Sequence, residues 1–239
     1  MFFFVSDDQF LLKFLRSKKY HKTAYSLLEM NLTITQKHKK WYSFEEKEDR
    51  TRMNQLYERG YIYPLNQKDS QGRRVIITNV KNFDPCSFTA PDTVRLCTFI
   101  AQLVFEEEEA QIAGVVIIKD FASCSFKYIS QFSISDLRTI LTTFQSAFPG
   151  RIKEFYAINL PSGTYYLMKG ILKVLHPKIR KRIFILKNSE ELQKYVSTDI
   201  LPKEYGGKVT EQEMVQIYKK TIAEKEHLIK ESLDHYILS

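Results

Sequence analysis

Several residues of this chain could carry out acid–base or metal chemistry, but their spacing assembles no familiar reaction centre. The sequence has no GxxxxGK(S/T) phosphate loop, no GxGxxG run and no GxSxG turn around a nucleophilic serine. None of the five histidines belongs to an HExxH pair with the spacing of metal ligands: His21, His38, His176, His227 and His235. We therefore expect a protein that is not an enzyme and that holds no metal or cofactor.

Three further features could take part in chemistry, and we favour a structural interpretation of each. Residues 106–109 are consecutive glutamates, which would point in different directions on a helix, so we expect a solvated helix end and no metal site. Asp120 ends an apolar run, where α/β folds often place functional groups, but no nucleophile accompanies it. His176 precedes Pro177 in a basic segment, and we expect it to cap the carboxyl end of a helix.

Positive charge is concentrated between residues 151 and 182. The whole chain has a formal net charge of +8, and this segment contains a single acid, Glu154. Its basic residues are Arg151, Lys153, Lys169, Lys173, Lys178, Arg180, Lys181 and Arg182. A concentrated basic surface attracts nucleic acid or acidic lipid, although the same residues could form an ordinary solvated helix face. Binding of nucleic acid would also need aromatic stacking groups on an open groove.

The elements that must position these residues follow from the apolar spacing. Helical spacing covers residues 8–60, with one helix around Phe14, a second around Leu27 and a third over residues 41–57. A turn signal follows at residues 69–72. We then expect strands at residues 75–78, 115–118, 155–158 and 183–186, with helices over residues 96–104 and 137–144 between the first three. This alternation favours a mainly parallel sheet covered on both faces, followed by a last helix over residues 210–233.

The sequence also bears on compartment. It contains no run of about eighteen apolar residues, the length that a membrane-spanning helix needs. Residues 1–5 form an apolar opening that is too short for a signal-peptide core. Cys86, Cys97 and Cys124 form no CxxC pair, and we expect them to be buried thiols of a cytoplasmic protein.

Four segments of the chain occur in an order and spacing that also characterise one known family. They are residues 10–20 (FLLKFLRSKKY), residues 114–121 with a strand that ends in Asp120, residues 148–153 (FPGRIK) and residues 200–207 (ILPKEYGG). The chain thereby resembles the CRAL-TRIO lipid-binding family, closest in pattern to its tocopherol and retinaldehyde carriers. Two departures stand out: the family usually has more residues before the first segment, and Ser123 stands where the family usually has a glycine.

The resemblance implies an α/β fold with a small helical region over residues 1–60 and a lipid-binding domain over residues 61–239 that ends in a helix. A mainly parallel sheet and flanking helices would enclose an apolar pocket, closed by a mobile gate helix that follows Pro161 and runs to about Leu175. Read directly, this segment is amphipathic, with Lys169 and Lys173 opposite an apolar face of Tyr165, Leu167, Met168, Ile171, Leu172 and Leu175. Gly163 and Gly170 loosen it, which suits a moving element, although an ordinary surface helix would look similar.

The resemblance also suggests which residues bind. The expected pocket lining is Val94, Cys97, Ala101, Val115, Ile117, Ile140, Thr143, Phe144, Phe148, Ile152 and Phe155, together with Leu167, Met168 and Ile171 of the gate helix. Lys119 falls where the tocopherol carrier has an aromatic lining residue, and it could contact a ligand carbonyl or carboxylate or pair with an acid of the protein. Positions that resemble the phosphoinositide-binding residues of that carrier are Arg151, Lys153, Lys178 and Arg182.

These residues together suggest a carrier that binds one hydrophobic ligand of tocopherol, retinoid or similar prenyl type and releases it at phosphoinositide-containing membranes. The expected partners are therefore a hydrophobic lipid and an acidic phospholipid surface, with no nucleic acid, and we expect a monomer in the cytoplasm that meets membranes transiently. Two alternatives remain open at this stage: a phosphoinositide-responsive module that recruits a partner to membranes, and a phospholipid exchanger.

Overall fold

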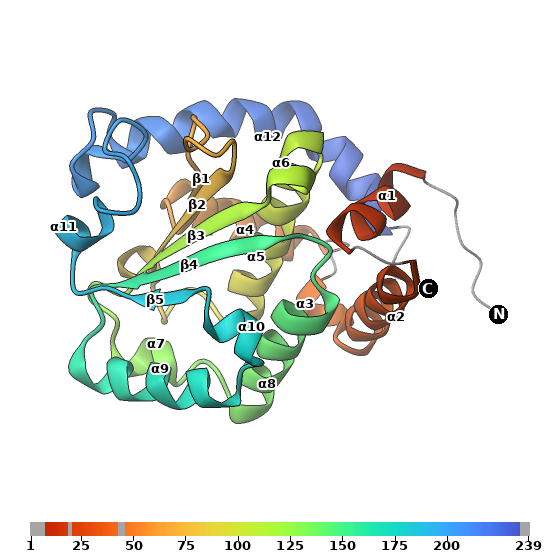
Figure 1. Cartoon of the computed structure of the whole chain (residues 1–239), viewed down its shortest axis with the longest axis horizontal. Helices are drawn as coiled ribbons and strands as arrows, with labels where there is room; N and C mark the ends of the chain where they lie inside the picture. Colours follow the sequence, from red (N-terminus) through yellow and green to blue (C-terminus); the bar gives the residue numbers. More distant parts are fainter. Residues whose placement is uncertain (1–7, 19–20, 43–45, 235–239) are drawn as a thin grey trace.

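The computed structural model describes residues 8–18, 21–42 and 46–234, and its centre is a five-stranded sheet (Figure 1). The strands follow one another across the sheet in chain order: β1 (Ile62–Pro64), β2 (Arg74–Asn79), β3 (Val115–Asp120), β4 (Ile152–Ile158) and β5 (Ile183–Ile185). Strand β1 is antiparallel to β2, and β2 to β5 run parallel. The mainly parallel sheet expected from the sequence is confirmed, and β1 is an addition to it.

The main helices between the parallel strands lie on one face of the sheet, because right-handed crossovers between strands in sequential order return on the same side. They are α5 (Ala90–Phe105), α8 (Ile134–Thr142), which continues into the π-helical segment η2 (Thr143–Ala147), and α9 (Ser162–Val174). The short helices α7 (Phe126–Ile129) and α10 (Pro177–Arg180) lie beside them. Figure 1 shows α7, α8 and α9 together below the sheet, so α9, the helix expected to be the gate, covers this face.

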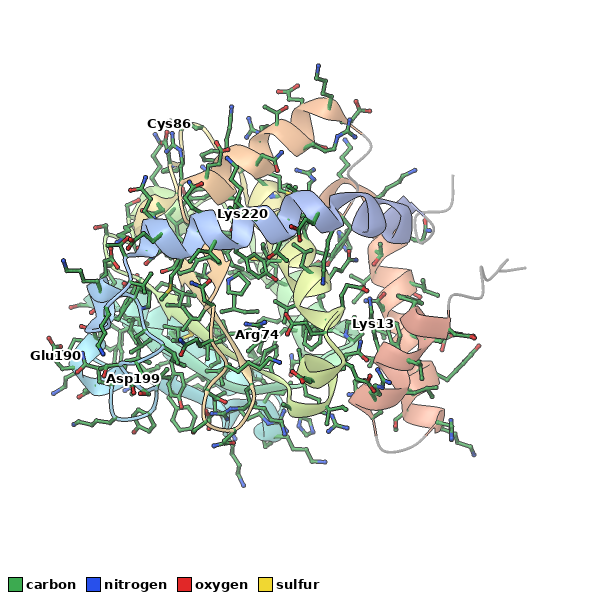
Figure 2. All side chains as sticks on the ribbon, turned by 90° about the horizontal axis from the view of Figure 1, so that it is seen from above. Lys13, Arg74, Cys86, Glu190, Asp199 and Lys220 are labelled. Atoms are coloured by element: carbon green, nitrogen blue, oxygen red, sulfur yellow. The ribbon has the colours of Figure 1, made fainter. Side chains whose placement is uncertain are left out.

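The opposite face is covered by elements within residues 189–234. They are α11 (Ser189–Leu192), the 3-10 turn η3 (Lys203–Tyr205) and the long helix α12 (Glu211–Asp234). Figure 2, seen from above, shows α12 running across this side of the molecule. Met214, Val215 and Tyr218 of α12 belong to the main core. This face is therefore tightly packed.

The ILPKEYGG segment makes the tight turn that brings Tyr205 back to the sheet. Gly206 has a φ of +94°, which favours glycine, and a Cβ on Gly207 would lie 1.7 Å from the carbonyl oxygen of Leu201. The two glycines are thus required by geometry. Because of this turn, the Tyr205 hydroxyl reaches the end of β3, where it lies 2.8 Å from the Asp120 carboxylate.

The first two helices, α1 (Asp8–Ser17) and α2 (His21–Lys37), form a small cluster of their own against the edge of the sheet domain. The next two, α3 (Lys39–Tyr42) and α4 (Lys47–Glu58), pack against α5, and α4 contributes Met53, Leu56 and Tyr57 to the main core. Phe14 packs with Ala24, Leu27 and Leu28 in a core separate from the main one. The third helix expected from the sequence is represented by α3 and α4, and residues 43–45 between them lie outside the described residues, as do residues 1–7 with the apolar opening.

The run of glutamates at residues 106–109 lies at a solvated helix end, as expected: Glu106, Glu108 and Glu109 are exposed at the start of α6 (Glu108–Ala113). Each carboxylate also pairs with a cation from another element. The pairs are Lys13 with Glu106, Arg74 with Glu107, Arg16 with Glu108 and Lys68 with Glu109. The run therefore also anchors α1 and the β2 region. Its divergent directions, which the sequence did predict, allow the four carboxylates to serve different partners.

No helix in the described part of the chain is long and apolar enough to cross a membrane.

Candidate functional site

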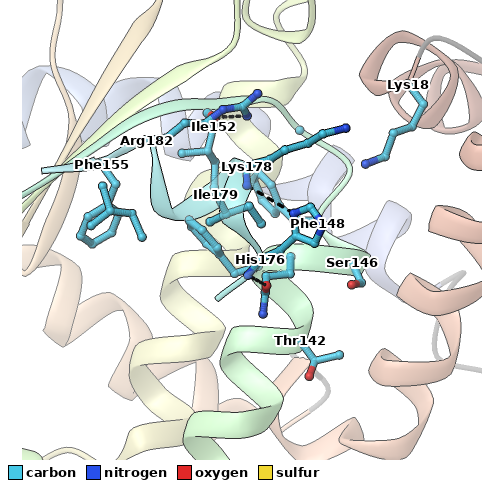
Figure 3. Close-up of a pocket in the computed structure, with 14 residues that line it drawn as sticks. Lys18, Thr142, Ser146, Phe148, Ile152, Phe155, His176, Lys178, Ile179 and Arg182 are labelled. Atoms are coloured by element: carbon cyan, nitrogen blue, oxygen red, sulfur yellow. Dashed lines mark hydrogen bonds between the residues drawn. The ribbon is translucent and has the colours of Figure 1, made fainter. Parts of the chain in front are cut away.

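A pocket of about 490 Å³ opens beside the amino-terminal end of β4 (Figure 3). Its walls come from α8 and η2, the start of β4, and α10 with the residues that follow it. The lining residues are Lys18, Thr142, Phe144, Gln145, Ser146, Phe148, Gly150, Ile152, Phe155, His176, Lys178, Ile179, Arg182 and Ile183. Aromatic and aliphatic side chains thus share the pocket with three cations.

The apolar part of the pocket depends on an irregularity in the sheet. Residues three apart on a regular strand point to opposite faces, yet Ile152 and Phe155 line the same pocket. The register between β3 and β4 shifts at Val115 and Val116, which pair with Ile152 and Glu154 respectively. This irregularity leaves Lys153 as an extra residue and turns Ile152 toward the pocket. The ring of Phe155 then packs edge-on against Phe144, with centroids 6.3 Å apart.

A π-helical turn supplies the facing wall. Segment η2 holds Phe144, Gln145 and Ser146, and such turns in α-helices are frequent at functional sites. The amino-terminal helices hold it in place: the Asn31 amide donates to the Ala147 carbonyl over 2.8 Å, and the Tyr42 hydroxyl lies 3.1 Å from that of Thr143. The small helical region is therefore coupled directly to one wall of the pocket.

The charged part of the pocket, which we call the basic rim, consists of Lys18, Lys178 and Arg182 (Figure 3). Arg182 donates to the Ile152 carbonyl over 2.7 Å, which anchors its guanidinium at the pocket. Burial, and then the nearby Arg182 charge, lower the pKa of Lys18. None of the lining residues is acidic, so the cations face the pocket without an opposing carboxylate in its wall. Such an arrangement favours a bound anion.

His176 also lines this pocket, but at the start of a helix and not at the end of one. Its Nδ1 accepts from the Lys178 backbone N–H over 3.3 Å, so it is the amino-terminal cap of α10. Its own backbone N–H donates to Gln145 over 2.8 Å, which joins α10 to the π-helical wall. The expected capping of a helix carboxyl end is wrong, because α9 already ends at Val174 and the chain turns before Pro177.

The structure brings together residues from both of the sets expected from the sequence. Phe144, Phe148, Ile152 and Phe155 of the expected apolar lining share the pocket with Lys178 and Arg182 of the expected phosphoinositide set. Arg151 and Lys153 lie outside this lining: Arg151 donates to the Arg16 carbonyl, and the Lys153 side chain runs beside Gly114. Lys18 was missed because it is distant in sequence and directly follows a helix, α1, whose pattern indicates only packing.

Val94 of the expected lining packs against Ile34, Tyr42 and Ala147, away from the sheet, and the rest surrounds the sheet face that α5, α8 and α9 cover. A central strand paired on both sides is normally buried on both faces. On β3, however, Val116 and Ile118 are buried whereas Ile117 and Lys119 on the other face are only partly so. The same partial burial applies to Val94, Cys97, Ala101, Ile140, Thr143, Met168 and Ile171, while Val115 is fully buried and Leu167 is exposed. The helices over this face are thus loosely packed on it.

Lys119 has an unusual environment on that face. Its ammonium lies 5.4 Å from the ring centre of Phe121 and 5.8 Å from that of Tyr128. Burial acts to lower the pKa of Lys119, but Tyr128, Cys97 and Cys124 favour the ammonium and raise the pKa above its ordinary value. Among the described residues, no carboxylate forms an ion pair with it.

Helix α9 has the features of a poorly anchored cover. Of its side chains only Thr164 is fully buried. Tyr166 and Val174 are 73% and 71% exposed, and Phe126 of α7 and Ile134 of α8 are exposed as well. At its start, the Asn159 amide donates to Asp120 over 2.9 Å, with Asn159 at a φ of +56°. The helix is therefore fixed at its amino end and presents apolar side chains to solvent.

Comparison with known proteins gives concordant matches. The family model of the CRAL/TRIO domain matches residues 58–207. Clavesin-2 of Homo sapiens is 30% identical over 207 residues, which cover 86% of this chain and 63% of that protein, and clavesin-1 of Xenopus laevis is 30% identical over 62% of its length. The chain thus spans less than two thirds of these relatives. The crystal structure of Sfh5 matches with a TM-score of 0.58 at 16% identity, over 91% of this chain and 81% of Sfh5, and supports the fold.

Proposed function

This chain belongs to the CRAL-TRIO lipid-binding family, and we propose that it is a carrier that binds one hydrophobic molecule and releases it at phosphoinositide-containing membranes. The proposed cargo is a prenyl-type lipid such as a tocopherol or retinoid. In this proposal the protein binds and transfers and does not catalyse a reaction.

The observation that carries this proposal is the partly buried sheet face. Ile117 on the central strand and Phe155 on its neighbour are register partners, and both stay incompletely covered by protein. Covering apolar surface with a ligand contributes about 25 cal/mol of binding free energy for each Å² removed from water. A lipid tail along the strands would therefore contribute several kcal/mol. The loosely packed α8 and α9 would then close over the tail.

The basic rim supplies the membrane half of the proposal. Lys178 and Arg182 follow α9 within a few residues, and a cation near an anionic leaflet contributes about 1 kcal/mol. The arginine also offers forked hydrogen bonds to phosphate. An inositol-lipid headgroup bound at the rim would therefore pull on the carboxyl end of α9, whose exposed Tyr166 and Val174 can enter the membrane interface.

The decisive experiment identifies the cargo. The purified protein is incubated with a total lipid extract, repurified and analysed by mass spectrometry under non-denaturing conditions. We expect one hydrophobic species at close to one per protein. If the protein returns empty, the carrier proposal fails.

A second candidate is a phosphoinositide-responsive module that recruits a partner to membranes without transferring lipid. The basic rim favours it, because a headgroup could bind there whether or not the sheet face is occupied. An empty protein that still binds phosphoinositide vesicles would support this module. Recovery of a phospholipid as the cargo would instead indicate a phospholipid exchanger.

For the cell we propose a cytoplasmic monomer that meets membranes transiently. Cys86, Cys97 and Cys124 are free thiols, which is consistent with a reducing compartment.

A further inference from the structure

The position of Lys119 on the sheet, and not only its positive charge, bears on how a ligand could bind. It lies on β3 two residues after Ile117, so both side chains point to the partly buried face. Its register partner on β4 is Ala157, five residues along the strand from Ile152 of the pocket. At about 3.3 Å per residue this path is about 16 Å long. A hydrocarbon chain could therefore run from Lys119 along the sheet to the pocket.

The surroundings of Lys119 leave its charge uncompensated. The acidic neighbour in sequence, Asp120, points to the opposite face, where it contacts Tyr205 and Asn159. The groups close to Lys119 are the rings of Phe121 and Tyr128 and the thiols of Cys97 and Cys124. Aromatic faces and neutral dipoles can retain an ammonium, but they do not neutralise it. The raised pKa of Lys119 shows that these groups keep it charged, so a cation without a counter-charge lies on this face, and a bound carboxylate would pair with it.

We propose that Lys119 is the head-group site of the carrier and that the cargo is a single-chain lipid with a carboxylate head, held with the carboxylate at Lys119 and the tail along Ile117 and Phe155. This inference rests on the proposed carrier function, but it favours an acidic lipid over a neutral prenyl cargo such as tocopherol. A neutral alcohol or ester would leave the ammonium without a counter-charge, whereas a carboxylate forms a charge-assisted hydrogen bond.

The basic rim offers the other possible place for the ligand carboxylate. The geometry favours Lys119 over the rim. The rim lies at the open end of the path, beside Ile152, and a head group there would place the hydrocarbon tail against the Lys119 ammonium. The orientation with the head at Lys119 satisfies this cation and leaves the rim available for a membrane headgroup. One ligand and one membrane lipid would then occupy different ends of the same path.

The test compares two ligands that differ only in the head group. Oleate and oleyl alcohol are titrated into the full chain by calorimetry, with wild-type protein and with Lys119→Met. We expect oleate to bind the wild type about 10- to 100-fold more tightly than the alcohol, and Lys119→Met to lose that difference while it binds the alcohol as before. Lys194→Met, an exposed lysine distant from the site, is the matched control and should behave as wild type.

Each other outcome decides against the inference. Equal binding of oleate and oleyl alcohol by the wild type would reject the acidic head group and leave the carrier function standing. Loss of oleate preference in Lys178→Ala together with Arg182→Ala, and not in Lys119→Met, would place the head at the rim. A protein that binds neither ligand and returns empty from the lipid extract would reject the inference and the carrier function together.

A second measurement does not depend on the variant folding. Carboxyl-labelled oleate bound to the wild type is followed by 13C NMR as the pH is lowered. Next to the ammonium, the ligand carboxyl should stay ionised to a lower pH than in a neutral apolar site, where burial raises a carboxyl pKa. A bound carboxyl that titrates above its ordinary range would overturn the proposal.

Discussion

The hydroxyl of Tyr205 lies 2.8 Å from the Asp120 carboxylate and 2.8 Å from the side-chain oxygen assigned to Asn79. A phenol has one proton and can donate to only one of them. Asn79 Nδ2 has no other partner among the described residues, so turning its amide by 180° lets it donate to Tyr205, while Tyr205 donates to Asp120. Asn79, Tyr205 and Asp120 then form one chain of donors and acceptors, and the ILPKEYGG turn is joined to β2 and β3 in the interior.

We therefore expect Tyr205→Phe to lower the free energy of unfolding by about 1–3 kcal/mol, because it removes the donor to a buried carboxylate and the acceptor for Asn79. Urea denaturation followed by circular dichroism measures this loss. Tyr195→Phe is the matched control, since Tyr195 is 52% exposed and stacks on Phe184 through its ring. If the two variants were equally stable, the network would contribute nothing.

The strands and the long helices could be predicted from the sequence because their apolar periodicity is strong. The strand β1 could not, because it contains three residues and includes Pro64, and a short edge strand has too few positions to show alternation. The break of the α8 helix into a π-helical turn was also invisible, since side-chain spacing is almost unchanged by one wider turn.

The basic rim shows a different limit of the sequence. Lys178 and Arg182 stood out because they belong to a dense basic segment, whereas Lys18 directly follows α1, more than a hundred residues earlier. The docking of α1 on the glutamates at residues 106–109, and of α2 on the π-helical segment, brings this end of the chain to the pocket. Contacts between segments so distant in sequence leave no periodic signal. The same docking explains why Arg151, expected at the headgroup site, instead bonds to Arg16.

This contrast between Arg151 and Arg182 gives a second prediction. Lys178→Ala and Arg182→Ala should each weaken binding to phosphatidylcholine vesicles that contain a phosphoinositide by about fivefold, which corresponds to about 1 kcal/mol per cation. Arg151→Ala should weaken it less and should instead lower the unfolding temperature, because it releases the Arg16 carbonyl. Vesicle sedimentation and thermal unfolding, with Lys194→Ala as control, separate the two effects. A larger binding loss for Arg151 than for Arg182 would show that the rim is misassigned.

The proposed motion of α9 can be tested at Gly170. A Cβ at this position meets nothing within 4 Å, so Gly170→Ala should fit and stabilise the helix by about 1 kcal/mol. If α9 must loosen to release a ligand, the variant should bind lipid as before and transfer it more slowly between vesicles. A fluorescent-lipid transfer assay measures the rate. Ser162→Ala, at the exposed start of α9, is the control, because it also introduces an alanine into α9 but replaces no glycine there. Gly72→Ala would not serve, because Gly72 has a φ of +73°, at which alanine is strained. An unchanged or faster rate in Gly170→Ala would contradict a gating role.

The thiol of Cys97 reports on whether the sheet face is enclosed. Burial raises the pKa of Cys97 to about 11, partly offset by the Lys119 charge, whereas Cys86 is exposed and contacts Lys127. The thiolate is the reactive form, so at pH 8 Cys97 should react with iodoacetamide about a hundredfold more slowly than Cys86.

The pH dependence of alkylation distinguishes a Cys97 thiol that reacts slowly because its pKa is raised from one that reacts slowly because the reagent cannot reach it. Between pH 7 and pH 9 the thiolate fraction of Cys97 rises about tenfold per unit, because its pKa lies above this range, whereas an ordinary thiol approaches its plateau near pH 9. Peptide mass spectrometry follows both cysteines in one sample, with Cys86 as the internal reference. Added oleate should slow Cys97 further and leave Cys86 unchanged, since only Cys97 lies beside the proposed ligand path. Equal rates at pH 8, or protection of both thiols alike, would mean that this face is open to solvent and encloses no ligand.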